Sequence, residues 1–190
     1  MNLVLITKWW WRCYVDRSSM WNTILSQRYG RKFSYNLENL SLGSSSSHMI
    51  RTITSIENLA DMMELVGRNC FKWVLNNGER ILFWEDWWHE NGVIQIQTPR
   101  LYRITKFKHC CLKEFREEWN KGDHKNNSTL WSRPLIDRDE GEILILKNII
   151  GSILLSNKED LLIWTPVRGV FTTKKCRELL FEQRIDANNN

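Results

Sequence analysis

The segment LNNGERILFWEDWW, residues 75–88, constrains the fold of this chain more than any other stretch. It places the pair Asn77 and Gly78 between two apolar runs, FKWVL and RILFW. An Asn-Gly pair favours a two-residue type I′ turn, because both central positions of that turn have positive φ. The sequence therefore predicts a β-hairpin over about residues 71–84.

Pairing about that turn sets Phe71 opposite Trp84 and Trp73 opposite Leu82, so one face of the hairpin is aromatic and aliphatic. Such a face must lie on other apolar groups. The chain has eleven Trp, whereas average usage would supply about two or three in a chain of this length. Since a tryptophan side chain needs a large contact surface, much of the core is expected to be aromatic.

Helices account for most of the remaining pattern. Residues 2–14 predict a helix with one stripe formed by Leu3, Ile6, Trp10 and Cys13. Trp9, Trp10 and Trp11 sweep about 200° of that helix, so at least two of its faces must be covered. Either this is a central core helix, or it has been separated from a larger parent protein.

The other predicted elements follow in order. Further helices are expected from Asp16 or Ser18 to Gly30, over residues 49–66, and through Leu112, Phe115 and Trp119. A capping box of Asp137 and Glu140 should begin another helix, whose apolar face holds Ile143, Leu146, Ile149 and Ile150. A cap at Thr173 should begin the last helix. A second hairpin is predicted over about residues 161–172. The fold class is therefore α+β, mainly helical with two β-hairpins.

This order divides the chain into five parts. They are a Trp-rich helical pair at 1–35, a Ser-rich loop at 36–48, a helix with the Asn-Gly hairpin at 49–98, helices with the second hairpin at 99–186, and a frayed tail at 187–190.

The motif order resembles the polymerase polyproteins of plant-style LINE-type (non-LTR) retrotransposons, in the region after the reverse transcriptase domain. Residues 3–12 match that family's LNLALLAKWWWR run, and residues 18–30 match DSLWxxVLxxKYG. The family's WRIGNGxxIxFWxDxW pattern falls here on Trp73, Asn77, Gly78, Ile81, Phe83, Trp84, Asp86 and Trp88. PRLY at 99–102, STLWSRPL at 128–135 and the segment 160–180, which resembles DxxxWxxxxxGxFSVKSxYxxL, follow in the family's order.

Three departures from the family pattern stand out. Asn76 replaces a Gly, Ile50 replaces a Trp, and Cys176 with Arg177 replaces Ala-Tyr.

The resemblance implies a connector between the polymerase thumb and a zinc-binding segment. The parent activity would be RNA-directed DNA synthesis with Mg²⁺. The family's Tyr-x-Asp-Asp motif does not occur in these residues, and its Cys/His segment would lie beyond Leu180. The chain is thus expected to be an incomplete, non-catalytic piece of a multidomain polyprotein, without its flanking domains and without a cofactor of its own.

A net charge of +5 and a pI near 9.0 make RNA or DNA a plausible partner. The best candidate segment is RLYRITKFKHCCLK, in which basic side chains can neutralise phosphates and aromatic rings can stack on bases. The alternative is a solvated helix face with core aromatics behind it. The candidate nucleic-acid-binding residues are Lys8, Arg12, Arg28, Lys32, Arg100, Tyr102, Arg103, Lys106 and Lys108.

Catalytic and metal-binding chemistry is not indicated. The acidic cluster of Asp137, Asp139, Glu140 and Glu142 sits at a helix start, where negative charge is favoured. Adjacent Cys110 and Cys111 are poor ligands for one tetrahedral ion, with or without His109. The odd number of cysteines and the absence of a C-x-x-C pair favour reduced thiols.

An intracellular protein, nuclear or cytoplasmic, is expected, because no signal peptide or membrane span is recognisable. Three rival functions remain open. They are a host protein-interaction module, a non-functional retroelement relic, and a carbohydrate-binding or hydrolytic domain with exposed Trp platforms.

Overall fold

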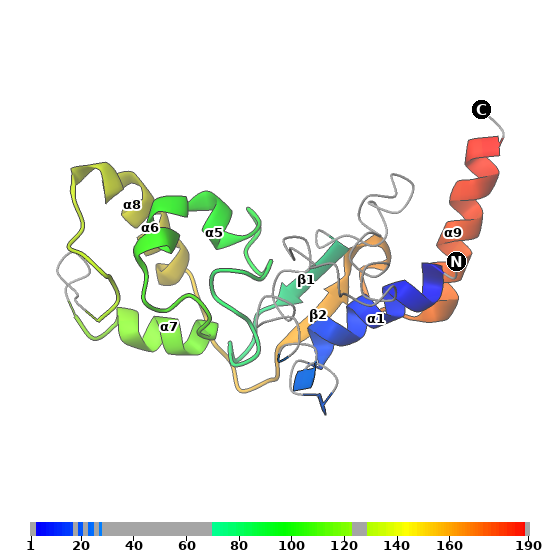
Figure 1. The fold of residues 1–190 in the computed structure, drawn as a ribbon, viewed down its shortest axis with the longest axis horizontal. Coiled ribbons are helices and arrows are strands. Elements are labelled where there is room, and N and C mark those ends of the chain that lie inside the picture. The colour runs from blue at the N-terminus through cyan, green and yellow to red at the C-terminus, as the bar shows by residue number, and fades with distance from the viewer. Residues whose placement is uncertain are drawn as a thin grey trace. The chain divides into compact units, whose positions relative to one another are not determined.

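The computed structural model describes residues 3–16, 19–20, 23–24, 27, 70–122 and 129–188. This part of the chain is mainly helical and contains a two-stranded antiparallel sheet, so the predicted α+β class is confirmed (Figure 1). It forms two compact units. Unit 1 comprises Met1–Phe71 and Ile163–Asn190, and unit 2 comprises Lys72–Leu162.

Several predicted elements cannot be compared with the structure. The helix ending at Gly30 lies mostly outside the described residues, and the Ser-rich loop at 36–48 and the helix at 49–66 lie entirely outside them.

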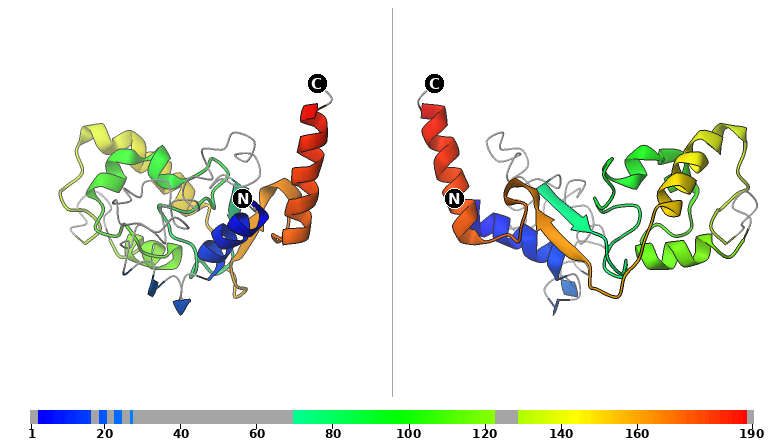
Figure 2. Two further views of the ribbon diagram at one scale, coloured as in Figure 1. Left: turned by 45° about the vertical axis from the view of Figure 1, so that its right-hand side comes forward. Right: turned by 180° about the vertical axis from the view of Figure 1, so that it is seen from behind.

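The sheet pairs β1 (Phe71–Val74) with β2 (Leu161–Trp164), and the two arrows run in opposite directions (Figure 2). The predicted hairpin over 71–84 is therefore wrong. Gly78 has φ 72°, but Asn77 does not have positive φ, so no type I′ turn forms. All six residues from Ile81 to Asp86 are buried, which is not the alternating pattern of a strand with one solvated face.

A buried carboxylate explains why the local turn signal is overridden. Asp160 is 3% exposed and accepts hydrogen bonds from the backbone N–H groups of Asn76, Gly78 and Arg80 at 2.8, 2.9 and 3.0 Å. The Asn76 carbonyl accepts a hydrogen bond from the Ser156 N–H at 2.7 Å. The Asn76 N–H and carbonyl groups, which would have paired with Glu79 beside a hairpin turn, are thus bound by long-range partners, and the same carboxylate also fixes the Gly78 and Arg80 N–H groups.

Trp84 and Trp88 of the 75–88 segment lie in the core of unit 2, whereas Trp87 is partly exposed. Phe83 stacks on Phe115 with ring centroids 3.9 Å apart, and Trp84 meets both rings edge-on at 5.0 and 5.2 Å. Trp88 packs 5.7 Å from Phe83 and donates its indole N–H to the Phe83 carbonyl at 2.9 Å. Edge-to-face and offset packing of this kind is what aromatic quadrupoles favour.

Asp86 closes the turn that positions these rings. Its carboxylate accepts the Leu82 N–H at 2.7 Å, and its own N–H donates to the Leu82 carbonyl at 3.2 Å. This turn belongs to no hairpin. Trp73 is also buried, 2% exposed, with the Arg80 guanidinium 5.7 Å from its ring.

The helices of unit 2 agree well with the sequence. Unit 2 contains α5 (Ile94–Gln97), α6 (Pro99–Ile104), α7 (Leu112–Trp119) and α8 (Glu140–Gly151), the last preceded by a 3-10 turn at Asp137–Asp139. Leu112, Phe115 and Trp119 of α7 are buried, as are Ile143, Leu146, Ile149 and Ile150 of α8, so both predicted apolar faces are confirmed.

The cap before α8 differs from the predicted one. Asp139, not Asp137, accepts the Ile136 N–H, at 3.1 Å.

Unit 1 contains α1 (Leu3–Val15) and α9 (Thr173–Asn188), which are in contact. The predicted first helix is confirmed. The side chains of its predicted apolar stripe, Leu3, Ile6, Trp10 and Cys13, are not among those that the structure describes. Trp11 lies between Phe71 and Phe171, with centroid separations of 5.6 and 5.8 Å. Its neighbour Trp9 is partly exposed.

The second predicted hairpin is also corrected. After β2 the chain forms a 3-10 turn at Thr165–Val167, and Arg168 has φ 49°. Trp164 and Gly169 then exchange backbone hydrogen bonds at 2.7 and 3.3 Å, a single bridge where two strands were expected. The next helix is capped by Thr172, whose hydroxyl accepts the Lys175 N–H at 3.2 Å, so the predicted cap at Thr173 is displaced by one residue.

Candidate nucleic-acid interface

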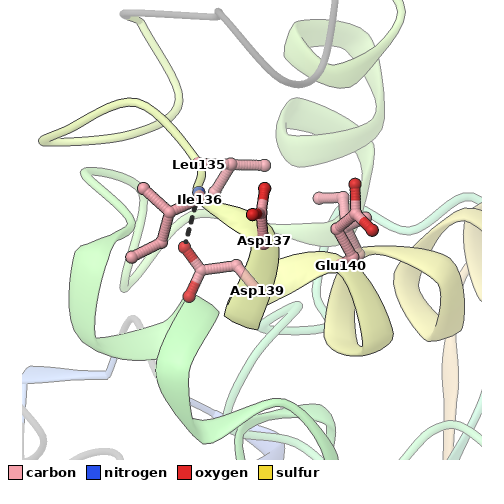
Figure 3. Close-up of a pocket in the computed structure, with 6 residues that line it drawn as sticks. Leu135, Ile136, Asp137, Asp139 and Glu140 are labelled. Carbon is pink, nitrogen blue, oxygen red and sulfur yellow. Dashed lines mark hydrogen bonds between the residues drawn. The ribbon is translucent and has the colours of Figure 1, made fainter.

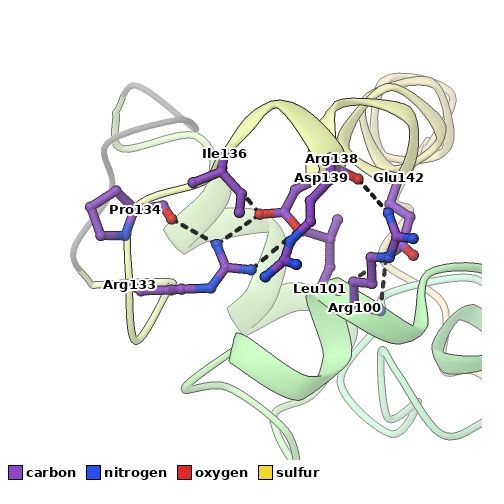
Figure 4. A network of polar contacts seen from close by, with 8 residues as sticks. All are labelled: Arg100, Leu101, Arg133, Pro134, Ile136, Arg138, Asp139 and Glu142. Carbon is purple, nitrogen blue, oxygen red and sulfur yellow. Dashed lines mark hydrogen bonds and ion pairs between the residues drawn. The ribbon is translucent and has the colours of Figure 1, made fainter.

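The basic segment after Pro99 begins as a short helix whose start is fixed from another part of unit 2. Pro99 occupies the first turn of α6, where its missing N–H is tolerated. The Glu142 carboxylate on α8 accepts the N–H groups of Arg100 and Leu101 at 2.9 and 3.0 Å. Leu101 is fully buried beneath them. The helix is thus anchored by one apolar side chain and one carboxylate, as Figure 4 shows.

Four basic side chains of this segment are exposed, namely Arg100, Arg103, Lys106 and Lys108. Tyr102 lies among them and is partly exposed. These five residues are called the α6 surface below. Arg100 and Arg103 belong to α6, which ends at Ile104, whereas Lys106 follows the helix and its N–H donates to the Leu130 carbonyl at 2.9 Å.

The structure adds a basic residue that the sequence pattern missed. The Arg100 guanidinium donates to the backbone carbonyl of Arg138 at 2.6 Å, and the Arg138 side chain is exposed (Figure 4). Thirty-eight residues separate the two arginines in the chain. No spacing rule in the sequence could have paired them, because the contact depends on how α6 packs near the start of α8.

A buried carboxylate joins two rings beside these cations. Glu85 is 5% exposed, and its Oε1 atom accepts the Tyr102 hydroxyl at 3.2 Å and lies 3.0 Å from His109 Nδ1. The Lys108 ammonium lies 5.6 Å from the centroid of the Tyr102 ring. His109, weighed in the sequence as a metal ligand, is instead a partner of this carboxylate.

The second predicted patch lies partly within the described residues. Lys8 and Arg12 are both exposed on α1, and the Arg12 guanidinium lies 5.8 Å from the Trp9 ring. Arg28 and Lys32 lie outside the described residues. Lys8 and Arg12 belong to unit 1, whereas the α6 surface belongs to unit 2.

The adjacent cysteines have structural roles in the part of the chain that the structure describes. Cys111 caps α7, because its sulfur accepts the Glu114 N–H at 3.4 Å while the Glu114 carboxylate accepts the Cys111 N–H at 3.0 Å. Burial, together with the neighbouring Cys111 and Glu114, raises the pKa of the Cys110 thiol to about 12. A thiol with so high a pKa is a poor nucleophile at neutral pH.

The acidic cluster before α8 also serves the fold. Asp139 is fully buried and pairs with Arg133 at 2.8 Å, which lowers the pKa of the Asp139 carboxyl. Figure 3 shows the small hollow around it, about 40 Å³, where Asp137 and Glu140 are exposed at the helix start. Among the described residues, no three His, Cys, Asp or Glu side chains are grouped so that they could hold a metal ion.

Comparison with known proteins gives no relative. No protein-family model, curated protein or solved structure matches this chain. The likeness to LINE-type polyproteins therefore stays a prediction from the order of motifs. In the described residues, none of the helices combines the length and the apolar character that a membrane span requires.

Proposed function

We propose that this chain is a non-catalytic connector from a LINE-type reverse transcriptase polyprotein, and that its α6 surface contacts RNA or DNA. The ordered series of motifs over nearly the whole sequence supports the family. The single observation that supports the contact is the exposure of four cationic side chains within nine residues, Arg100 to Lys108.

The arrangement suits phosphates better than a small ligand. The four side chains flank a partly exposed tyrosine in the sequence, the Lys108 ammonium lies 5.6 Å from its ring, and the backbone carbonyl of exposed Arg138 accepts a hydrogen bond from Arg100. A protein that neutralises four or five phosphates should show a slope of log affinity against log salt of about −3 to −4.5, depending on the strandedness of the nucleic acid. Such a slope reports released counterions and does not depend on base sequence.

A charge-matched pair of variants tests the contact. One variant replaces the four cations of the α6 surface by Gln, and the other replaces four exposed lysines elsewhere, Lys147, Lys158, Lys174 and Lys175. Affinity of the full chain for labelled RNA and DNA oligonucleotides is measured by fluorescence anisotropy from 50 to 300 mM salt. The first variant should lose most of the slope and the second should keep it.

Two results would count against the contact. Equal losses in the two variants would mean that net charge alone attracts the nucleic acid. No salt-dependent binding by the parent chain would reject a nucleic-acid role altogether.

The family assignment has a separate test. The genomic DNA on both sides of the reading frame should encode the Tyr-x-Asp-Asp motif upstream and a Cys/His segment downstream, either intact or interrupted by stop codons. Interrupted frames would identify a retroelement relic. Flanks with neither motif in any reading frame would contradict the assignment.

A protein-interaction module is the second candidate, and exposed apolar side chains favour it. Leu144 and Ile145 on α8 are 59% and 40% exposed, and Leu154 is 88% exposed. Exposed apolar groups that gather in one patch mark interaction sites. If this candidate is correct, the chain should show no salt-dependent binding to oligonucleotides, and Leu144→Glu with Leu154→Glu should abolish self-association measured by light scattering.

A further inference from the structure

We infer that the α6 surface takes a single strand of nucleic acid, with Tyr102 and His109 as base-stacking rings that the buried Glu85 carboxylate holds in position. The inference rests on the proposed function and specifies its ligand. It assigns a binding role to His109 and a positioning role to Glu85, neither of which follows from charge.

Glu85 can position the rings because its own backbone is fixed. It lies in the turn that the Asp86 carboxylate closes through the Leu82 N–H, and the preceding residue, Trp84, is fully buried. Only 6% of the Glu85 side chain is exposed. A carboxylate oxygen placed in this way restricts the rotamers of any side chain that hydrogen-bonds to it.

Both rings are bound to the same oxygen atom. The Tyr102 hydroxyl lies 3.2 Å from Glu85 Oε1, and His109 Nδ1 lies 3.0 Å from it. The Tyr102 ring also packs against Trp84, with centroids 5.8 Å apart and planes at 55°. The rings therefore keep fixed positions without a ligand, so little side-chain entropy is lost when a base stacks on them.

Both rings remain accessible. The His109 side chain is 52% exposed and Tyr102 is partly exposed. The Lys108 ammonium lies over the Tyr102 ring at 5.6 Å. An exposed cation–π contact is weaker than the stacking of a base on an aromatic ring, so a base can displace Lys108, whose charge is then available to a phosphate.

Two ring platforms beside a cationic row suit a single strand. The bases of a duplex are stacked on one another, and their faces become available only after the strands separate. Duplex binding would use Arg100, Arg103 and Lys106 but would leave the rings without a role. Stacking on tyrosine and histidine should also tolerate any base sequence, because every base has a π-face.

The test compares a labelled single strand with a hairpin duplex of the same length, both bound to the full chain at pH 8. Tyr102→Leu and His109→Ala should each weaken single-strand binding about fivefold or more, with duplex affinity and salt slope unchanged. Tyr102→Phe keeps the ring but loses the hydroxyl that Glu85 holds, so it should weaken single-strand binding, though less than Tyr102→Leu does. His89→Ala, at a partly exposed histidine in another loop, is the control.

Glu85 has its own pair of variants. Glu85→Gln keeps an acceptor oxygen and should retain the preference for the single strand, whereas Glu85→Leu should reduce that preference while duplex binding persists. If Tyr102→Leu does not fold, His109→Ala decides the question, because the His109 side chain is 52% exposed and its truncation leaves the packing around Trp84 in place.

Failure of the inference and failure of the proposed function are distinguishable. Salt-dependent binding with equal affinity for single strand and duplex, or unchanged single-strand affinity in both ring variants, would overturn the stacking role and leave the phosphate contact intact. No salt-dependent binding to either ligand would overturn both.

Discussion

Asp160→Asn is the substitution that probes the fold of unit 2 most directly. The carboxylate accepts three backbone N–H groups, two of them, from Asn76 and Gly78, at Oδ1 and the third, from Arg80, at Oδ2. Asparagine has almost the same shape but keeps one acceptor oxygen. Its amide N–H₂ group would then face the Arg80 N–H, donor against donor.

The expected cost follows from these three bonds. Two charge-assisted hydrogen bonds become neutral ones, each weakened by roughly 1 kcal/mol, and the Arg80 N–H, whose hydrogen bond is partly buried, loses its acceptor at a cost of about 1 kcal/mol or more. The free energy of unfolding should therefore fall by about 2–4 kcal/mol. Asp160→Ala removes all three acceptor contacts and should cost more.

Urea unfolding at pH 7, followed by tryptophan fluorescence and circular dichroism, measures the change. Hydrogen exchange should show lost protection at residues 76–80. Glu159→Gln is the control, because that neighbouring side chain is exposed and should change stability by less than about 0.5 kcal/mol. If Asp160→Asn is as stable as this control, the carboxylate does not hold the segment in place and our explanation of the missing hairpin is wrong.

Three further predictions use other parts of unit 2. Gly78→Ala should destabilise the protein by about 2 kcal/mol, because φ at this position is +72° and the new Cβ would lie 3.0 Å from the side chain of buried Leu112. Gly141→Ala on α8, where a new Cβ meets no atom within 4 Å, should be neutral or stabilising in the same urea titration. The pKa of Asp139 is lowered by its hydrogen bond from Arg133, so its contribution to stability is present above the ordinary Asp value of 3.8 and is lost as pH falls through the folded-state value. Arg133→Gln should therefore flatten the acid limb of a stability–pH curve, and an unchanged limb would contradict this pairing. Cys110, with a pKa of about 12, should be alkylated by iodoacetamide at pH 8.5 far more slowly than in urea-unfolded protein, and equal rates measured by mass spectrometry would refute its burial.

The candidate interface could be predicted from sequence in part. The spacing of basic residues in RLYRITKFKHCCLK pointed to a cationic surface, and the structure exposes all four of its predicted cations. Arg138 and Glu85 could not be predicted, because each joins the candidate interface through a contact between segments distant in the sequence. His109 carried a metal-binding alternative in the sequence, since adjacent His and Cys residues are compatible with either role.

Helices such as α7 and α8 were determined by the sequence itself. Their apolar residues recur every three or four positions, and the hydrogen bonds that form a helix join residues four apart, so the signal and the structure are equally local.

The partner of β1 was decided only by the tertiary structure. Asn77 and Gly78 favour a local hairpin, but Asp160, 82 residues beyond Gly78, binds the backbone N–H groups of Asn76, Gly78 and Arg80 with a charged acceptor. The Asn76 N–H is the donor that a hairpin would pair across the turn, and a buried carboxylate that satisfies it together with two others outweighs a modest turn preference. No local pattern records that competition, because its outcome depends on which distant segments pack beside the turn.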